Sequence, residues 1–312
     1  MRLLVTGGAG FIGSNTVDAL IAEGRSEVAV LDDLSAGKRA QVNPKARFYE
    51  ADLRDAAKVQ QIIAQERPEA IIHLAAQMDV RRSVADPPFD AQVNLVGFLN
   101  LIEAARQHGL KRVIFSSTGG AIYGEQEQFP CNEDHPRRPI SPYGVAKFAT
   151  EAYLFFYKAQ YEIDYVALRY ANVYGPRQDP HGEAGVVAIF CGRMLEDKPV
   201  TIYGDGEQTR DYVYVGDVVR ANLAAVASPV SGAFNIGTGV ETSVNQLFRT
   251  LAKAAGTSRA AEYGPARPGE QMRSVISPAR AARELNWRPD VSLATGLAQT
   301  YRFFQDRFAK GA

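Results

Sequence analysis

Cysteine, excess charge and long apolar runs are all scarce in this chain. Only two cysteines, Cys131 and Cys191, occur among 312 residues. They cannot by themselves form a disulfide framework or a metal cluster, so we expect a reducing compartment and no metal site. Lys plus Arg equals Asp plus Glu, at 35 each. This balance gives no reason to expect a nucleic acid or an anionic membrane as partner.

The remaining composition is that of a globular protein, with 46% apolar and 22% charged residues. No apolar run reaches the length of a membrane span, and the N-terminus enters a strand without a separate signal peptide. The length allows one large domain or two moderate ones. These features predict a cytoplasmic enzyme or binding protein.

A glycine-rich turn, Thr6-Gly7-Gly8-Ala9-Gly10-Phe11-Ile12-Gly13, organises the first part of the chain. A short apolar strand over 1–5 precedes it, and helical spacing over 14–24 follows it. This is the context of a dinucleotide fingerprint, in which the pyrophosphate rests on the helix N-terminus. The spacing GxxGxxG matches the usual GxGxxG only in part, so a purely structural turn is the alternative. We expect contacts to the cofactor from Gly7, Gly10, Phe11, Ile12 and Gly13.

An acidic residue follows at the required distance. Asp32 ends the apolar strand over 28–31 and lies 19 residues after Gly13. There a carboxylate accepts hydrogen bonds from the adenosine ribose and repels a 2′-phosphate, which favours NAD over NADP. Lys38 and Arg39 argue the other way, but we interpret them as a solvated loop.

Strands and helices alternate over the next 90 or so residues, which predicts an α/β fold of the Rossmann type with a doubly wound parallel sheet. Strands are expected over 47–53, 70–76 and 112–117, with helices over 55–66 and 90–108. Ligands bind at the carboxyl ends of such strands, so cofactor contacts are expected from Asp52, Leu53, Leu74, Ala75, Ala76 and Ser116. Alternatively, Asp52 caps the helix that follows it. His73 is interpreted as a core histidine.

The segment Ser141-Pro142-Tyr143-Gly144-Val145-Ala146-Lys147 opens another helix, with Ser141 as N-cap and Pro142 at the first position. Tyr143 and Lys147 share one helix face because they are four residues apart. A tyrosine with a pKa near 10 is a poor base at neutral pH. The Lys147 charge and the helix N-terminus both lower that pKa. The helix over 148–161 is apolar on more than one face, which favours a homodimer through this helix.

These motifs, taken together, resemble the extended short-chain dehydrogenase/reductase family. TGGAGFIG, the acidic strand end, HLAA, SST and YGVAK occur in the family's order across nearly the whole chain. The resemblance implies Tyr143 as catalytic base and Lys147 as its partner, which also holds the nicotinamide ribose. It implies that Thr118 hydrogen-bonds the substrate oxygen and that Asn94 helps to order the site.

Further segments resemble the nucleotide-sugar branch of this family. The segment 168–177, LRYANVYGPR, implies nicotinamide contact at Tyr170 and diphosphate contact at Asn172. GDGEQTRDYVYV and RPGE imply that Arg210 and Arg267 hold the diphosphate and that Glu270 contacts the nucleotide ribose. Two planar guanidinium groups suit a diphosphate, although a surface ion pair is the alternative for each arginine.

The branch resemblance implies a 4-epimerase that interconverts UDP-galactose and UDP-glucose. Tyr143 removes the proton of the 4-hydroxyl, NAD takes and returns the C4 hydride, and the 4-keto sugar turns over in between. Gly119 and Gly120 stand where the 4,6-dehydratases carry an acidic pair, and the Glu of the decarboxylases is missing as well. Alternatives are UDP-glucuronate, suggested by Arg81, UDP-N-acetylglucosamine, suggested by Ser274, and a non-catalytic NAD-binding sensor.

We expect the chain to fold into a domain and a smaller lobe. An NAD-binding domain covers 1–172 and takes in about 211–238, and a smaller nucleotide-sugar-binding lobe covers 173–312. Helices are expected over 277–287 and 290–308. No chemistry is assigned to either helix.

Overall fold

A computed structural model describes residues 1–24, 26–180, 185–266 and 271–309. Its centre is a seven-stranded parallel sheet in the order β11-β6-β5-β4-β1-β2-β3. The strands are β1 (Arg2–Thr6), β2 (Glu27–Asp32), β3 (Arg47–Glu50), β4 (Ala70–His73), β5 (Arg112–Thr118), β6 (Asp164–Tyr170) and β11 (Gly232–Ile236). The predicted α/β fold of the Rossmann type is confirmed.

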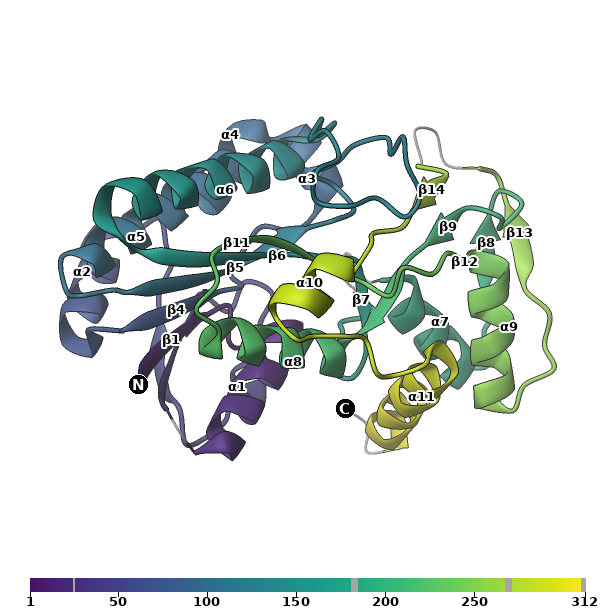
Figure 1. The fold of residues 1–312 in the computed structure, drawn as a ribbon. Coiled ribbons are helices and arrows are strands. Elements are labelled where there is room, and N and C mark those ends of the chain that lie inside the picture. Colours follow the sequence, from purple (N-terminus) through teal and green to yellow (C-terminus); the bar gives the residue numbers. More distant parts are fainter. Residues whose placement is uncertain (25, 181–184, 267–270, 310–312) are drawn as a thin grey trace.

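Helices cover both faces of this sheet (Figure 1). One face packs on α1 (Phe11–Glu23), α8 (Val215–Ala227) and α10 (Ala279–Glu284). The other packs on α2 (Ala56–Glu66), α5 (Gly97–Arg106) and α6 (Pro142–Tyr161). The strands β1, β2 and β4 in the middle of the sheet are mostly apolar because both of their faces are buried.

The strand order reverses between β1 and β4. From β1 the chain proceeds outward through β2 to β3, and from β4 it proceeds through β5 to β6 in the opposite direction. The connections therefore leave on opposite sides and open a crevice at the carboxyl ends of β1 and β4, where open α/β sheets bind ligands.

Several predicted boundaries were wrong. The first helix begins at Phe11, inside the glycine turn, and the strands expected to end at 53 and 76 end at Glu50 and His73. The helix expected over 90–108 consists of α4 (Pro87–Ala91), the π-helix η2 (Gln92–Val96) and α5, and α3 (Val80–Ala85) was not predicted. The end of each strand was overestimated because the apolar small residues that follow it are buried in loops.

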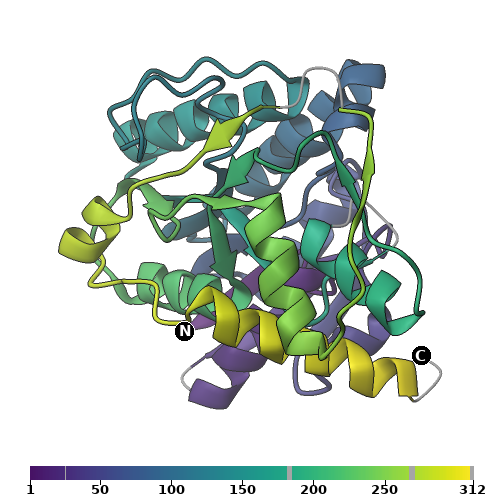
Figure 2. The same cartoon turned by 90° about the vertical axis from the view of Figure 1, so that its right-hand side faces the viewer.

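The described part of the smaller lobe combines short strands with helices, which face the viewer in Figure 2. Its core joins α7 (Val186–Leu195), α9 (Val244–Ala255) and α11 (Leu293–Ala309) to aromatic side chains such as Tyr174 and Tyr212. Its small sheets pair β10 (Tyr212–Tyr214) with β7 (Asn172–Tyr174), β13 (Glu262–Gly264) with β8 (Thr201–Tyr203), and β9 (Thr209–Arg210) with β12 (Thr242–Ser243) and β14 (Arg273–Ser274). Trp287, near α10, packs instead under the large sheet.

Within the described residues, no helix has both the length and the apolar character needed to cross a membrane. Both cysteines are buried free thiols.

Candidate active site

The glycine turn forms a tight cradle at the start of α1. Gly7 has φ +70°, which favours glycine, and a Cβ at residue 13 would lie 2.0 Å from the Gly7 carbonyl oxygen. Gly10 is the N-cap residue of α1 and no side chain caps the helix there. A helix N-terminus without a side-chain cap is a site for an anion. The turn therefore fits the pyrophosphate of a dinucleotide.

Asp32 lies beside this cradle, as the last residue of β2. Its carboxylate accepts hydrogen bonds from the Ala9 N–H at 2.9 Å and from the Leu34 N–H at 2.9 Å. Burial raises the pKa of Asp32, and the two backbone N–H groups act in the opposite direction. The carboxylate thus holds the glycine turn as well as standing where the ribose contact is predicted. Lys38 and Arg39 are exposed, as expected for a solvated loop.

Asp52 does not cap the helix that follows it, so that alternative was wrong. Its carboxylate accepts from the Arg54 guanidinium, which lowers its pKa, while Asp55 caps α2 by accepting from the Lys58 N–H at 3.0 Å. Leu53 is buried, and its carbonyl accepts from Asn100 at 2.9 Å.

The loop after β4, which holds Leu74, Ala75 and Ala76, lies against the glycine turn. A Cβ at Gly7 would lie 2.6 Å from the Ala75 nitrogen. Asn94, buried in the π-helix, pairs with the backbone of Gln77: its Oδ1 accepts from the Gln77 N–H and its Nδ2 donates to the Gln77 carbonyl, both at 2.9 Å. Asn94 therefore orders this loop, consistent with its predicted role.

His73, at the end of β4, is a core histidine as interpreted. It hydrogen-bonds Thr6 through Nδ1 at 2.7 Å, and its ring stacks on Phe115. Burial, and then the nearby Lys147 charge, lower its pKa to about 3.

Ser141 caps α6, as predicted, by accepting from the Gly144 N–H at 3.2 Å. One turn into the helix, Lys147 is buried, and its Nζ donates to the Ser116 carbonyl at 2.8 Å. The same Nζ lies 5.6 Å from the centre of the Tyr143 ring. Burial lowers the pKa of Lys147 to about 8, against the opposing effect of Asp90. Lys147 is thus mostly charged at neutral pH and close to the half-buried Tyr143.

Thr118 ends β5, and its Oγ1 accepts from the Ala121 N–H at 3.2 Å. The strand carries Ser116, the acceptor for Lys147, two residues earlier. Lys147 thus joins the first two turns of α6, which carry Tyr143, to the end of the strand that carries Thr118.

The remaining predicted residues lie at the junction with the lobe. The Tyr170 hydroxyl is buried and donates to Asn222 at 2.7 Å, so a cofactor contact is expected from its backbone and not from that hydroxyl. Asn172 is exposed at the start of β7. Arg210, half-buried, is the residue of β9 that pairs with both Thr242 and Ser274. Arg267 and Glu270 lie outside the described residues.

The sequence reasoning missed Asp211, which adjoins Arg210. It is 1% exposed, and its carboxylate accepts from the backbone N–H of Thr238 and of Gly239 and from the Thr238 hydroxyl. This carboxylate joins the loop after β11 to the strand that carries Arg210. Its signal in the sequence is a charged residue directly before the short run Tyr212-Val213-Tyr214.

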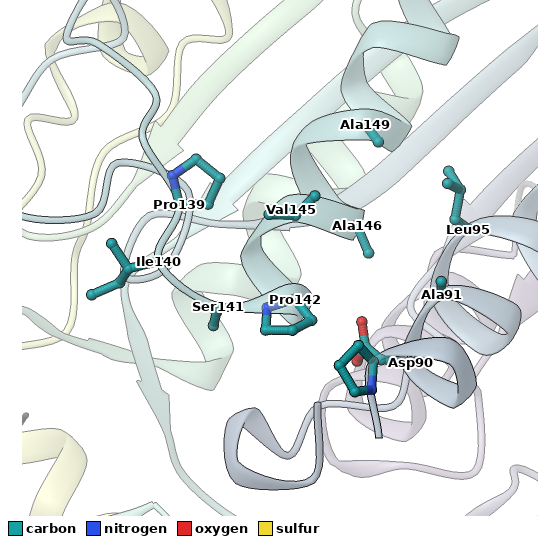
Figure 3. A pocket seen from close by; sticks show the side chains of 11 residues that line it. Asp90, Ala91, Leu95, Pro139, Ile140, Ser141, Pro142, Val145, Ala146 and Ala149 are labelled. Carbon is teal, nitrogen blue, oxygen red and sulfur yellow. The ribbon is translucent and has the colours of Figure 1, made fainter. Parts of the chain in front are cut away.

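A groove of about 550 Å³ lies beside α6 (Figure 3). Figure 3 shows Ala146 and Ala149 of α6 facing Ala91 and Leu95 across it. Neither Tyr143 nor Lys147 lines the groove. It therefore occupies a different stripe of α6 from the one that carries the predicted catalytic pair.

A family model described as the NAD dependent epimerase/dehydratase family matches residues 3–237. The chain belongs to this family. Membership confirms the predicted family and the prediction of NAD as cofactor, for which the glycine cradle and Asp32 are suitably placed. Epimerisation and dehydration are therefore the reactions for which we consider the side chains of Thr118, Tyr143 and Lys147.

The similarity to several known proteins extends over nearly the whole chain. The UDP-glucose 4-epimerase of Mycolicibacterium smegmatis is 48% identical, over 98% of this chain and 99% of the relative. A structure of the Thermotoga maritima UDP-glucose 4-epimerase with UDP-glucose is 51% identical, with a TM-score of 0.96 over 99% of this chain and 100% of that one. The Thermus thermophilus enzyme of the same name, in complex with NAD, is 49% identical, with a TM-score of 0.92 over 98% and 99%.

Proposed function

We propose that this family member interconverts UDP-galactose and UDP-glucose by inverting the configuration at C4 of the sugar, with NAD as a resident cofactor. The observation that carries the proposal is end-to-end similarity to enzymes named UDP-glucose 4-epimerase, one of which holds UDP-glucose. The proposal is supported by the Tyr143–Lys147 pair, which can supply the acid–base chemistry of this reaction and which Lys147 ties to the strand that ends in Thr118.

Each of the three residues has a defined role in the proposal. Tyr143 takes the proton of the sugar 4-hydroxyl and later returns it, and Thr118 hydrogen-bonds the same oxygen. Lys147 stabilises the phenolate of Tyr143, because with a pKa of about 8 it carries its charge at neutral pH. NAD bound at the glycine cradle and Asp32 would supply the reversible hydride acceptor that inversion at C4 requires.

The packing around Gly119 argues against dehydration. Elimination of water requires additional acid and base groups next to the sugar. A Cβ at residue 119 would lie 2.6 Å from Cδ1 of Ile276 and 3.3 Å from the Tyr170 carbonyl oxygen. An acidic side chain at this position would therefore have to displace the Ile276 side chain.

The nucleotide sugar is proposed to bind where the lobe meets the sheet. Among the described residues, Arg210 is the candidate for the diphosphate contact. Its strand β9 is paired on both sides, with β12 and with β14, which fixes the position of its backbone. Asn172, in the adjoining β7, is the proposed second contact. Of the lobe's other predicted ligands, Arg267 and Glu270 lie outside the described residues and remain predictions.

A homodimer in the cytoplasm is part of the proposal. The outer side of α6 exposes large apolar side chains, and the groove of Figure 3 continues this apolar surface toward α4. Exposed apolar side chains that gather on one helix are typical of a protein–protein interface. The exposed residues are Val145, Tyr153, Phe155, Phe156 and Tyr161.

A second substrate, UDP-N-acetylglucosamine, is favoured by one observation. Ser274, the suggested gate residue, is 4% exposed and pairs with Arg210, so a small side chain stands next to the proposed diphosphate contact. The uronate alternative has less support, because Arg81 is exposed on α3.

The test is to incubate purified protein with UDP-galactose and no added cofactor, and to separate the products by chromatography. Appearance of UDP-glucose supports both 4-epimerisation and retained NAD. The reaction is then repeated with added NAD, with UDP-glucuronate and with UDP-N-acetylglucosamine. Conversion of the uronate alone contradicts the hexose assignment, and no conversion of any of them by folded, NAD-loaded protein indicates the sensor alternative.

A further inference from the structure

A buried polar network lies directly behind the predicted catalytic pair. Ser117 stands between Ser116, the acceptor for Lys147, and Thr118, and its hydroxyl donates to Oε1 of Glu151 at 2.6 Å. Glu151 lies one turn after Lys147 on α6. Two successive residues of β5 are therefore bonded to two successive turns of α6.

Glu151 is held in turn by an arginine from the next strand. Arg169 of β6 donates from Nε to Oε1 at 3.0 Å and from Nη2 to Oε2 at 2.6 Å. Its third nitrogen, Nη1, donates to the Tyr123 hydroxyl at 2.8 Å. The side chains of Arg169 and Glu151 are only 1% and 6% exposed. Both carboxylate oxygens of Glu151 are thus hydrogen-bonded within the protein interior.

A buried ion pair of this kind adds little net stability, because the cost of removing two charges from water offsets their attraction. Its directional hydrogen bonds, unlike the surrounding apolar contacts, can fix the position of α6. Apolar packing of α6 on the sheet is non-directional, whereas charge-assisted hydrogen bonds fix both distance and angle. The network can therefore set the register of α6 against the end of β5.

We propose that Glu151, held by Arg169, is a positioning residue that acts through Ser117 to fix Tyr143 and Lys147 relative to Thr118. The role rests on the proposed epimerase reaction. A displacement of about 1 Å at a catalytic group costs on the order of 100-fold in rate. Loss of the network is therefore expected to affect turnover more than binding of the nucleotide.

The test uses Ser117→Ala and Glu151→Gln, with Thr150→Val as the matched control. Thr150 is equally buried on α6, but its hydroxyl donates to the Ala146 carbonyl of the same helix at 2.9 Å and bonds nothing on β5. We expect kcat for UDP-galactose to fall roughly 10- to 100-fold in both network variants. KM and the content of bound NAD are expected to stay near wild-type values, and the control is expected to keep its kcat.

The pH profile separates positioning from simple destabilisation. Among the described residues, the titratable groups that interact with Lys147 are Asp90 of α4 and the neutral His73 of β4, whereas Glu151, one turn along α6, is paired with Arg169. If Lys147 moves away from Tyr143, the phenolate loses its neighbouring charge. The acid limb of the kcat profile is then expected to shift to higher pH in the network variants and to stay in place in Thr150→Val.

A spectroscopic titration gives a readout independent of turnover. The tyrosinate absorbance of each protein is followed against pH, and the same titration in a Tyr143→Phe background identifies the signal of that residue. If wild-type protein fails to convert UDP-galactose, the proposed function fails while this titration still tests the positioning role.

Three outcomes overturn the inference: an unchanged kcat, an unchanged tyrosinate midpoint, or losses that Thr150→Val reproduces. Should Glu151→Gln fail to fold, the smaller change Ser117→Ala decides the question, because it removes one hydroxyl and leaves the ion pair intact.

Discussion

The two ends of the site are built in different ways. At the cofactor end, parallel strands of four to seven residues place the glycine cradle, Asp32 and Thr118 at one edge of a continuous sheet. At the sugar end, Arg210 and Ser274 lie on strands of two residues, whose partners come from distant parts of the chain. The residues predicted for the cofactor end thus lie at the edge of one large continuous sheet, whereas the proposed diphosphate contact lies on a two-residue strand of a small separate sheet.

The sharpest test of this division is Tyr143→Phe. Removal of the phenol is expected to lower kcat by about 10³-fold, because no other group takes the proton of the 4-hydroxyl. Bound NAD and KM for UDP-galactose are expected to change little, since the cradle and the lobe are intact. Tyr153→Phe, on the exposed side of α6, is the matched control. A variant that keeps wild-type kcat would remove Tyr143 from the mechanism.

A second substitution tests the cofactor end alone. Gly13→Ala places a Cβ 2.0 Å from the Gly7 carbonyl oxygen, so the start of α1 must shift. The expected result is about 100-fold weaker NAD binding, on the scale of an overpacking cost of up to about 3 kcal/mol. NAD released from denatured protein measures the loss. Gly192→Ala is the control, because its new Cβ would lie 3.7 Å from Pro180, an ordinary contact. If Gly13→Ala kept NAD at the wild-type level, the proposal that the glycine turn binds the pyrophosphate would be wrong.

This division also explains what the sequence could predict. The glycine turn, Asp32 and the Tyr143–Lys147 spacing are each read within a few residues of chain, and their positions at strand or helix ends follow from hydrophobic periodicity. The π-helix around Asn94 was missed because an apolar pattern does not reveal one extra residue per turn. Boundaries were wrong wherever buried loops continued the apolar run of a strand.

The contacts made by Asp211 and Arg169 show more clearly what could not be predicted from the sequence. Arg169 is a charged residue in β6 and Asp211 lies between β9 and β10, and the sequence offers no means of finding their partners. Asp211 bonds to Thr238 and Arg169 to Glu151, pairings that only the folded chain brings together. Resemblance, and not spacing, supplied the roles of Asn172 and Arg210.

The sugar end is tested by Arg210→Met, which removes a charged donor and keeps most of the apolar length of the side chain. A hydrogen bond to a charged group contributes about 2 kcal/mol, so KM for UDP-galactose is expected to rise roughly 30-fold while kcat changes little. Arg273→Met is the matched control, because Arg273 is exposed and pairs with Glu241. An equal rise in KM for both variants would indicate a general charge effect and not a diphosphate contact.

The smallest effect is expected from His73, which supports the cofactor end without entering the chemistry. Its pKa is about 3 in the folded protein, against the ordinary value of 6.5. Between these values the unfolded chain binds a proton that the folded chain does not, so stability falls as the pH falls through 6.5. The expected loss is about 2 kcal/mol between pH 6.5 and pH 5.

His73→Phe isolates this contribution, because phenylalanine keeps the ring contacts with Phe98 and Phe115 and cannot titrate. The variant loses the Thr6 hydrogen bond and is expected to be about 1 kcal/mol less stable at pH 7. Its stability should then decline less steeply than that of the wild type toward pH 5, as measured by urea unfolding. His108→Asn, on the half-buried turn after α5, controls for loss of a histidine elsewhere. Parallel pH curves for wild type and His73→Phe would show that the folded protein protonates His73 as readily as the unfolded chain does. The interpretation of His73 as a buried, neutral histidine would then be wrong.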